Sequence, residues 1–438
     1  MEAKGYMAVA VFAVTYAFVF SGRVDKTIAV ITGATVMILT GLIRQGDAFR
    51  SIDLNVIFLL IGMMIITHYL AKSGFFGYLA VRIAQWARGY PAALVALMCA
   101  ATGVLSSLVD NVTTVLLVAP VTFIIAQQLE INPVPFLVFE VLAANIGGTA
   151  TLIGDPPNIL IGSRAGLTFN EFLWHLAPIT FACLAGLIGM AVFVIAKAGH
   201  VPRALRLRVM EMRPEKAITD KVTLVKSLTV LALVLAAFLL HDVAGFEPAT
   251  VALAGSAILI LITDGNPTKA FEAVEWPTLF FLMGLFVLVS GLDANGVLQW
   301  AAGEVMGVTQ GSLWVTALIL IWFSAVLSSL IGNIPLVATM IPIVHAMVPV
   351  LSSQPGADAK AVSFALWWSL ALGACFGGNG SVFGAAANVV VLEIADRSGT
   401  PISMGTFSRY SIPVTIATLA ASSAYVVLRY VAGAGQAL

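Results

Sequence analysis

Residues 105–120, LSSLVDNVTTVLLVAP, are apolar at both ends and polar in the middle, where Asp110 and Asn111 stand together. Lipid offers no hydrogen bonds, so these polar groups must face protein or a watery cavity. The chain repeats this stretch at a fixed offset of 222 residues, as LSSLIGNIPLVATMIPI at residues 327–343. The positions that are identical in both copies are Leu105/Leu327, Ser106/Ser328, Ser107/Ser329, Leu108/Leu330, Asn111/Asn333, Val115/Val337 and Pro120/Pro342. This agreement predicts a duplicated chain, each half of which places a polar element inside the membrane.

The composition predicts an all-α polytopic membrane protein. Of the 438 residues, 60% are hydrophobic and 10% are charged, whereas a soluble domain carries about 25% charged residues. Apolar segments of spanning length recur from end to end. The net charge is zero and no basic cluster with aromatic residues is present, so no nucleic-acid partner is predicted. The three cysteines, Cys99, Cys183 and Cys375, lack metal-site spacing, and neither a metal nor another cofactor is predicted.

Two glycine-rich stretches predict broken helices. The first is GGTATLIGDPPN at residues 147–158, and the second is GGNGSVFGAAAN at residues 377–388. They align at an offset of 230, because eight additional residues lie in the loop around residues 352–359. Helices are also predicted near residues 6–20, 27–43 and 52–71, with an amphipathic segment at 75–87.

The predicted organisation is a first transmembrane repeat at residues 1–197, a cytoplasmic linker at 198–226, and a second repeat at 227–438. The polar stretch lies near the centre of an apolar run over residues 91–129, as expected for the tip of a re-entrant hairpin. Each repeat then has five spanning helices, a re-entrant hairpin and a broken helix. Five is odd, so the second repeat is inverted relative to the first.

The distribution of positive charge predicts the orientation in a bacterial inner (plasma) membrane. Cytoplasmic loops carry an excess of Lys and Arg. With both termini on the outer, periplasmic side, sixteen of the 22 Lys and Arg residues fall inside and six outside.

Carboxylates occur in only one copy of the polar elements. Asp110 and Asp155 correspond to Gly332 and Ala385 in the second copy. An unpaired carboxylate at the bilayer centre costs ~3 kcal/mol or more, so it tends to protonate or to hold a cation. Asp110 and Asp155 are therefore the predicted proton or cation carriers. The alternative is that they only cap helix amides, with Asp155 the stronger candidate for a cap.

Side chains with amide or hydroxyl groups surround these acids in the sequence and are predicted to bind the substrate, since they supply donors and acceptors. They are Ser107, Asn111, Thr114, Asn145, Thr149, Thr151, Asn158, Ser329, Asn333, Asn379, Ser381 and Asn388.

The segments DNVTTVLLVAP at residues 110–120 and ANIGGTATLIGDPPN at 144–158 resemble the ion transporter superfamily. The resemblance is to the branch that holds ArsB-type arsenite permeases, NhaD-type sodium/proton antiporters and the melanosomal P protein. It implies an inverted repeat with a scaffold part and a moving transport part, often as a homodimer. The spacing of Asp110, Asn111, Asn145 and Asp155 is similar to the NhaD pattern. Dicarboxylate symporters carry Ser-Asn-Thr at the hairpin tips, and VDN at 109–111 and IGN at 331–333 depart from it, which argues against di- and tricarboxylates.

The resemblance implies proton-coupled efflux of arsenite or antimonite, carried as As(OH)3 or Sb(OH)3, by alternating access. The alternative is an NhaD-type sodium/proton antiporter, because two carboxylates suit a hard cation. The sequence does not decide whether an ATPase subunit docks on the linker. It also leaves a channel as a possible alternative to a transporter. The chain is not expected to be an enzyme, because residues 152–155 and 109–110 do not match the motifs of intramembrane aspartyl proteases.

Overall fold

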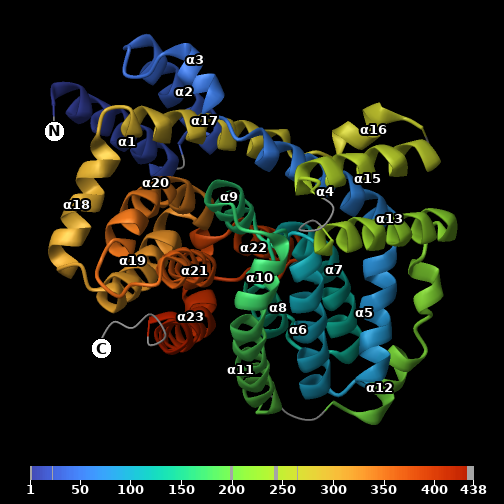
Figure 1. Cartoon of the computed structure of the whole chain (residues 1–438). Coiled ribbons are helices and arrows are strands. Elements are labelled where there is room, and N and C mark those ends of the chain that lie inside the picture. The colour runs from blue at the N-terminus through green and yellow to red at the C-terminus, as the bar shows by residue number, and fades with distance from the viewer. Residues whose placement is uncertain (1, 22, 198–200, 241–244, 264, 432–438) are drawn as a thin grey trace.

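The computed structural model describes residues 2–21, 23–197, 201–240, 245–263 and 265–431 (Figure 1). Every regular element in these ranges is a helix, as predicted. The helices of the first half are α1 (Ala3–Ser21), α2 (Lys26–Leu39), α3 (Gln45–Arg50), α4 (Leu54–Lys72), α5 (Phe75–Trp86), α6 (Pro91–Leu108), α7 (Asn111–Leu129), α8 (Val134–Gly148), α9 (Pro156–Ala165), α10 (Phe169–His175) and α11 (Ala177–Ala196).

The helices of the second half are α13 (Lys221–Leu239), α15 (Pro248–Ile262), α16 (Pro267–Glu272), α17 (Trp276–Asp293), α18 (Val297–Thr309), α19 (Leu313–Ile331), α20 (Asn333–Ser352), α21 (Ala359–Gly377), α22 (Ala386–Arg397) and α23 (Met404–Val426). The first residues of α2 to α7 recur 222 positions later as the first residues of α15 to α20. The helix α9 recurs as α22 at an offset of 230. The duplication found in the sequence is thus also present in the order and the boundaries of the helices.

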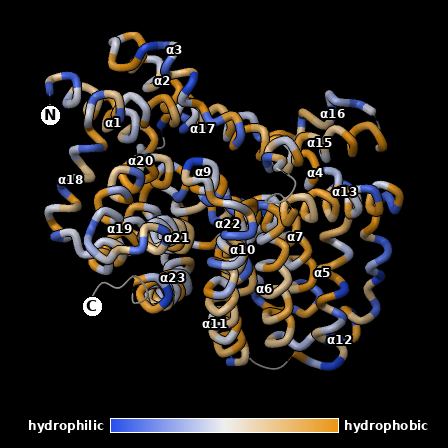
Figure 2. The backbone as a smooth tube through the Cα atoms, viewed as in Figure 1, coloured by the Kyte–Doolittle hydropathy of each residue, from blue (hydrophilic) through white to orange (hydrophobic). Residues whose placement is uncertain are grey.

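Ten of the described helices are long and apolar enough to cross a membrane. Figure 2 shows α6 and α11, for example, as largely hydrophobic tubes. These ten include the four hairpin arms α6, α7, α19 and α20. The apolar segment Ala3–Val19 of α1 and the helices α2, α8 and α15 are shorter, so the set differs from the ten predicted crossings. The helix predicted at residues 27–43 ends at Leu39, because Gly41 adopts a positive φ of 70° and turns the chain.

The helices pack into two parts, which we label after the scaffold part and the transport part that the resemblance implies. In the scaffold part, α4 of the first half packs against α13 and α15, while α17 of the second half packs against α1 and α2. In the transport part, α6 packs against α8 and α11, and α19 packs against α21 and α23. In Figure 1, α1 to α3 and α15 to α17 lie along the top of the view, above α6, α8, α11, α19 and α21. Each contact has a counterpart in the other half, as expected for a duplicated fold.

The two halves also exchange contacts inside the transport part, where α7 packs against α22 and α20 against α9. The hairpin of each half therefore lies beside the broken helix of the other half. This exchange brings both hairpin tips and both helix breaks to one region of the molecule, where residues of all four line a single cavity.

Close backbone contact holds each hairpin against its own broken helix. A Cβ added to Gly147 of α8 would lie 2.0 Å from the carbonyl oxygen of Gly103 in α6. At the equivalent contact, a Cβ on Gly377 would lie 2.4 Å from the Cα of Ala325. Small residues at such crossings let helices approach closely, which is a main source of packing energy in lipid.

The linker between the halves lies against α5. It contains α12 (Arg203–Met210) and a 3-10 turn, η1 (Pro214–Ala217). Arg82 of α5 pairs with Glu215 at 2.8 Å. The linker predicted at residues 198–226 ends six residues earlier, because α13 begins at Lys221, and residues 198–200 lie outside the described residues. The hydroxyl and the amide of Thr223 hold the pKa of Asp220, which caps α13, below its usual value.

Candidate functional site

A cavity of about 390 Å³ lies where the hairpin tips and helix breaks meet the scaffold part. The exposed residues Lys26 and Glu275 lie at one end, at the starts of α2 and α17. Its lining includes Lys26, Met63, Met64, Asp110, Asn111, Asp155, Glu275, Thr278, Phe281, Asn333, Ala385 and Ala386. The cavity therefore reaches from one surface to the buried polar centre predicted from the sequence.

Asp155 is the most deeply buried acid of this cavity, with 1% of its surface exposed. Asn333 at the tip of the second hairpin donates to both carboxylate oxygens at 3.2 Å. Asn111 at the tip of the first hairpin donates to Oδ1 at 3.5 Å. The carboxylate of one broken helix thus holds both hairpin tips together.

Asp110 is only half-buried, and its Oδ1 accepts a hydrogen bond from the amide of Thr113 at 2.8 Å. It is the N-cap of α7, whereas Asp155 makes no side-chain cap bond at the start of α9. The capping alternative therefore applies to Asp110 rather than to Asp155. Both acids still line the same cavity, so a cation could contact both of them.

Asn145 connects the breaks of the two halves below this cavity. Its Oδ1 accepts a hydrogen bond from Asn111 at 3.0 Å. Its Nδ2 donates to Asn379 at 2.8 Å and to Asn388 at 2.9 Å, both in the second half. The side chain of Asn145 therefore links the first hairpin tip to the second helix break.

Three hydrogen bonds of the first break recur at equivalent positions of the second. Ser106 donates to the Ala144 carbonyl, and its counterpart Ser328 donates to the Ala374 carbonyl. Thr151 donates to the Ser107 carbonyl, and its counterpart Ser381 donates to the Ser329 carbonyl. Asn158 donates to the Thr151 carbonyl, and its counterpart Asn388 donates to the Ser381 carbonyl. Bonds that are duplicated in this way keep the shape of the breaks. Among the described residues, no such duplicate exists for the hydrogen bonds that Asp155, Asn111 and Asn145 make with one another and with the other half. These bonds therefore differ from the duplicated bonds that keep the shape of the breaks.

The structure divides the predicted site residues into two groups. Asp110, Asn111, Asp155 and Asn333 line the cavity. Ten other predicted ligands are absent from its described lining, because their side chains bond to backbone carbonyls or to other asparagines at the breaks. They are Ser107, Thr114, Asn145, Thr149, Thr151, Asn158, Ser329, Asn379, Ser381 and Asn388.

Lys26, Glu275 and Thr278 line the cavity although the sequence did not single them out. Thr278 donates to the Glu275 carboxylate at 3.2 Å, and the Lys26 ammonium lies 5.7 Å from the ring centroid of Phe281. Charged residues at the ends of apolar helices usually extend into the interface, so nothing in the local sequence marked these as cavity residues. Only the packing of α2 against α17 brings Lys26 to Glu275.

The two half-helices that start at this cavity offer opposite chemistry. The helix α9 begins with Pro156 and Pro157, which have no backbone N–H, directly after the carboxylate of Asp155. The helix α22 begins with Ala386 and Ala387, whose N–H groups have no side-chain cap. The first half therefore presents negative charge without donors, while the second presents donors without negative charge.

Replacing Asn333 with alanine is expected to strengthen the binding of a proton or metal cation at Asp155 roughly 10- to 100-fold, since Asn333 donates to the ionised carboxylate and a hydrogen bond to a charged group contributes about 1.5–3 kcal/mol. The measurement is the concentration of cation that half-saturates thermal stabilisation of the purified protein. Thr339→Ala, six residues further along α20, is the matched control, because its hydroxyl donates to the Pro335 carbonyl of its own helix and it is not among the described residues that line the cavity. Equal affinities of the two variants would contradict a role of Asn333 at Asp155.

Two broken helices, two hairpin tips and a buried carboxylate in an open cavity define an integral membrane transporter. A family model described as citrate transporter, CitMHS, matches residues 16–373. The chain therefore belongs to the CitMHS citrate transporter family. Since transporters are not enzymes, the prediction that the chain is not an enzyme is confirmed.

The chain is similar over nearly its whole length to curated proteins, among them one named as a transporter and one named as a membrane protein. The chain is 44% identical over 429 residues to an uncharacterized transporter of Mycobacterium tuberculosis, covering 97% of this chain and 98% of that protein. It is 42% identical over 428 residues to the 46 kDa membrane protein of Mycobacterium leprae, with the same coverage. It is 30% identical over 519 residues to the P protein of Mus musculus, covering 98% of this chain and 61% of the P protein. The resemblance to the P protein is thus confirmed, while the ArsB-type specificity stays a prediction.

Solved transporter structures share this fold at low sequence identity. The YdaH transporter of Alcanivorax borkumensis superposes with a TM-score of 0.62 at 15% identity and covers 99% of both chains. MtrF of Neisseria gonorrhoeae superposes with a TM-score of 0.59 at 13% identity, over 91% of this chain and 84% of MtrF. At these identities the likeness concerns the fold alone.

Proposed function

We propose that this protein is a cation-coupled secondary transporter in which Asp155, assisted by Asp110, carries the coupling proton or sodium ion. The burial of Asp155 supports this most directly. Its hydrogen-bond partners Asn111 and Asn333 are neutral, and no lysine or arginine among the described residues pairs with it. A carboxylate in such surroundings is stable when a proton or a metal cation neutralises it.

Sodium/proton exchange is the simplest activity that this site supports. The carboxylates of Asp155 and Asp110 and the amide oxygen of Asn111 are hard oxygen ligands, the type that binds alkali and alkaline-earth cations in proteins. A proton and a sodium ion would compete for Asp155. Competition for one group, combined with exposure to alternate sides, is sufficient for exchange without any further substrate site.

Proton-coupled arsenite efflux is the second candidate, since As(OH)3 is a neutral triol that Asn111 and Asn333 could hydrogen-bond. The cavity offers it fewer groups than the sequence predicted, because the hydroxyls of Ser107, Thr114 and Ser329 are bonded to their own helices. Cys375 is buried beside Asn158, with 3.6 Å between Sγ and Oδ1, and is not among the described residues of the cavity wall. The support for arsenite is therefore weaker than that for a hard cation.

Citrate, named in the family description, is a third substrate to test. A free citrate anion would meet Asp110 and Asp155 and a single lysine, Lys26, which is unfavourable unless a cation enters with it. The free N–H groups at the start of α22 would face one carboxylate of such a complex. The tip sequences at residues 109–111 and 331–333 also argue against a tricarboxylate.

The predicted inverted arrangement fits this proposal. With the N-terminus outside, Lys26 and Glu275 lie at the cytoplasmic ends of α2 and α17, so the cavity opens to the cytoplasm. Exchange of contacts between equivalent helices of the two halves supports two-fold symmetry, and the predicted odd number of crossings in each half would put that axis in the membrane plane.

The test uses purified protein in proteoliposomes that contain a pH-sensitive dye. Sodium, arsenite and citrate are added separately across a preset pH gradient, and protein-free liposomes are the control. We expect sodium alone to drive proton movement. A response to arsenite or citrate without one to sodium would reverse the choice of substrate, and no cation dependence with any of the three would overturn the proposal of cation coupling.

A further inference from the structure

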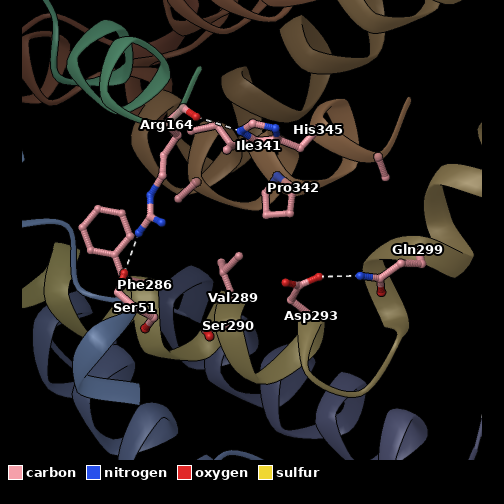
Figure 3. Close-up of a pocket in the computed structure, with 12 residues that line it drawn as sticks. Ser51, Arg164, Phe286, Val289, Ser290, Asp293, Gln299, Ile341, Pro342 and His345 are labelled. Carbon is pink, nitrogen blue, oxygen red and sulfur yellow. Dashed lines mark hydrogen bonds between the residues drawn. The ribbon is translucent and has the colours of Figure 1, made fainter. Parts of the chain in front are cut away.

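A second cavity, of about 440 Å³, lies between the scaffold and transport parts (Figure 3). Its polar lining includes Ser51, Arg164, Asp293 and His345. It shares no lining residue with the cavity at Asp155, and no role has been assigned to it above.

Three helices take part in both cavities, each with different residues. On α17, Thr278 and Phe281 line the cavity at Asp155, whereas four residues between positions 286 and 293 line the second cavity, among them Phe286 and Asp293. On α20, residues 333–335 line the first cavity, and five residues between positions 338 and 346 line the second, among them His345. The helix α17 rises about 27 Å over its 18 residues, so the two cavities lie toward opposite ends of it. The two cavities therefore follow one another along α9, α17 and α20.

Arg164, near the end of α9, closes the boundary between the two parts at the second cavity. Its Nε lies 3.3 Å from Asp53 Oδ2, and its terminal nitrogen donates to the Ser51 carbonyl at 2.5 Å. The guanidinium also lies 5.2 Å from the ring centroid of Phe286, and Ser163 donates to Asp53 at 2.7 Å. In Figure 3 the Arg164 side chain extends from α9 toward Ser51 and Phe286 of the scaffold part.

The same arginine is attached to the transport part through its backbone. The Nε2 atom of His345 in α20 lies 2.8 Å from the Arg164 carbonyl oxygen. The helix α9 begins directly after Asp155, and α20 begins at Asn333, which bonds to Asp155. A displacement of Asp155 and its hairpin tip is therefore transmitted along α9 and α20 to Arg164.

We propose that Arg164, Ser163 and Asp53 form the gate that closes the transport route on the face opposite Lys26 and Glu275. The gate is closed in this structure, while the cavity at Asp155 is open toward the other face. To expose Asp155 to the opposite face, the contacts of α9 with residues 51–53 have to break. This inference rests on the proposed function, because a gate of this kind operates only in an alternating-access transporter.

Cross-linking tests the gate. In the double variant Asp53→Cys/Ser163→Cys, copper phenanthroline is expected to join the two residues and to lower transport at least tenfold, with recovery on reduction by dithiothreitol. The native cysteines are buried and do not compete. Controls are the two single variants and Ser403→Cys/Thr406→Cys, a pair within the transport part whose hydroxyls lie 2.9 Å apart. Undiminished transport by the cross-linked protein would overturn the gate.

A labelling experiment tests the gate without any transported substrate. Met64→Cys lines the cavity at Asp155 and is expected to react with a membrane-impermeant thiol reagent only from the face of Lys26. Adding Asp53→Asn should raise the labelling rate from the opposite face at least fivefold, whereas the matched change Asp47→Asn on exposed α3 should not. Unchanged sidedness would overturn the gate. Changed sidedness in a protein that moves none of the three substrates would retain the gate and count against the proposed function.

Discussion

Replacing Asp155 with asparagine is expected to abolish cation-dependent proton movement, a loss of at least 100-fold, while the protein remains folded. Asparagine has nearly the same shape and keeps an oxygen for the amides of Asn333 and Asn111, so the contact between the hairpin tips should persist. The variant has no group at this position that can be protonated or bind sodium with full charge. Flux is measured in proteoliposomes, and thermal unfolding in detergent reports the fold.

Asp396→Asn is the matched control, since Asp396 is an exposed acid on α22, outside the cavity. It should keep the wild-type flux. A neutral side chain costs less to bury than a charged one, so the melting temperature of Asp155→Asn should equal or exceed that of the wild type. Coupled flux that survives in Asp155→Asn would show that the coupling ion binds elsewhere.

The second large effect is expected on stability, from Gly147→Ala. The added Cβ would lie 2.0 Å from the Gly103 carbonyl oxygen and 2.5 Å from the Gly103 Cα. Both neighbours are backbone atoms, so α6 and α8 have to move apart along the contact that positions the first hairpin. Overpacking of a rigid contact costs about 1–3 kcal/mol or more, and here we expect the upper end or a failure to fold. The measurements are the melting temperature and the monodisperse yield on size exclusion.

Gly189→Ala is the control for this substitution, because nothing lies within 4 Å of a Cβ at Gly189 in the middle of α11. There alanine should be neutral or stabilising, since it favours the helix by about 1 kcal/mol relative to glycine. If the two variants melt at the same temperature, the close approach of α6 to α8 does not contribute to stability.

The membrane transporter class and the duplicated helices could be predicted from properties of short sequence segments, without knowledge of which segments contact one another. Hydrophobicity adds up along a segment, so spanning helices can be recognised without knowing their neighbours. The breaks at residues 147–158 and 377–388 follow from Gly and Pro, which act within a few residues of their own position. The absence of acids at Gly332 and Ala385 was visible once the copies were aligned. Asp110 and Asp155 could thus be selected together before any contact was known, but which of the two only caps a helix could not be decided.

Which polar side chains line the cavity could not be decided in this way. The hydroxyl of a serine or threonine in a helix can bond to a carbonyl three or four residues earlier, or to a group of a neighbouring helix. The sequence does not show which of these two bonds forms. Ser107 and Thr114 take the local bond, while Thr151 bonds to another helix. The side chains of ten predicted ligands therefore form hydrogen bonds at the helix breaks and do not belong to the described lining of the cavity.

By itself, the sequence determined that this is a duplicated, all-helical membrane protein with two acids in one copy, because hydrophobicity, helix breaking and charge are properties of single segments. The tertiary structure decided that Lys26 and Glu275 share a cavity with Asp155, and that Arg164 contacts Asp53 at the proposed gate. These residues are separated by more than a hundred positions in the chain. Their meeting depends on how α2, α4, α9 and α17 pack, since lipid-facing and protein-facing sides of such apolar helices look alike in sequence.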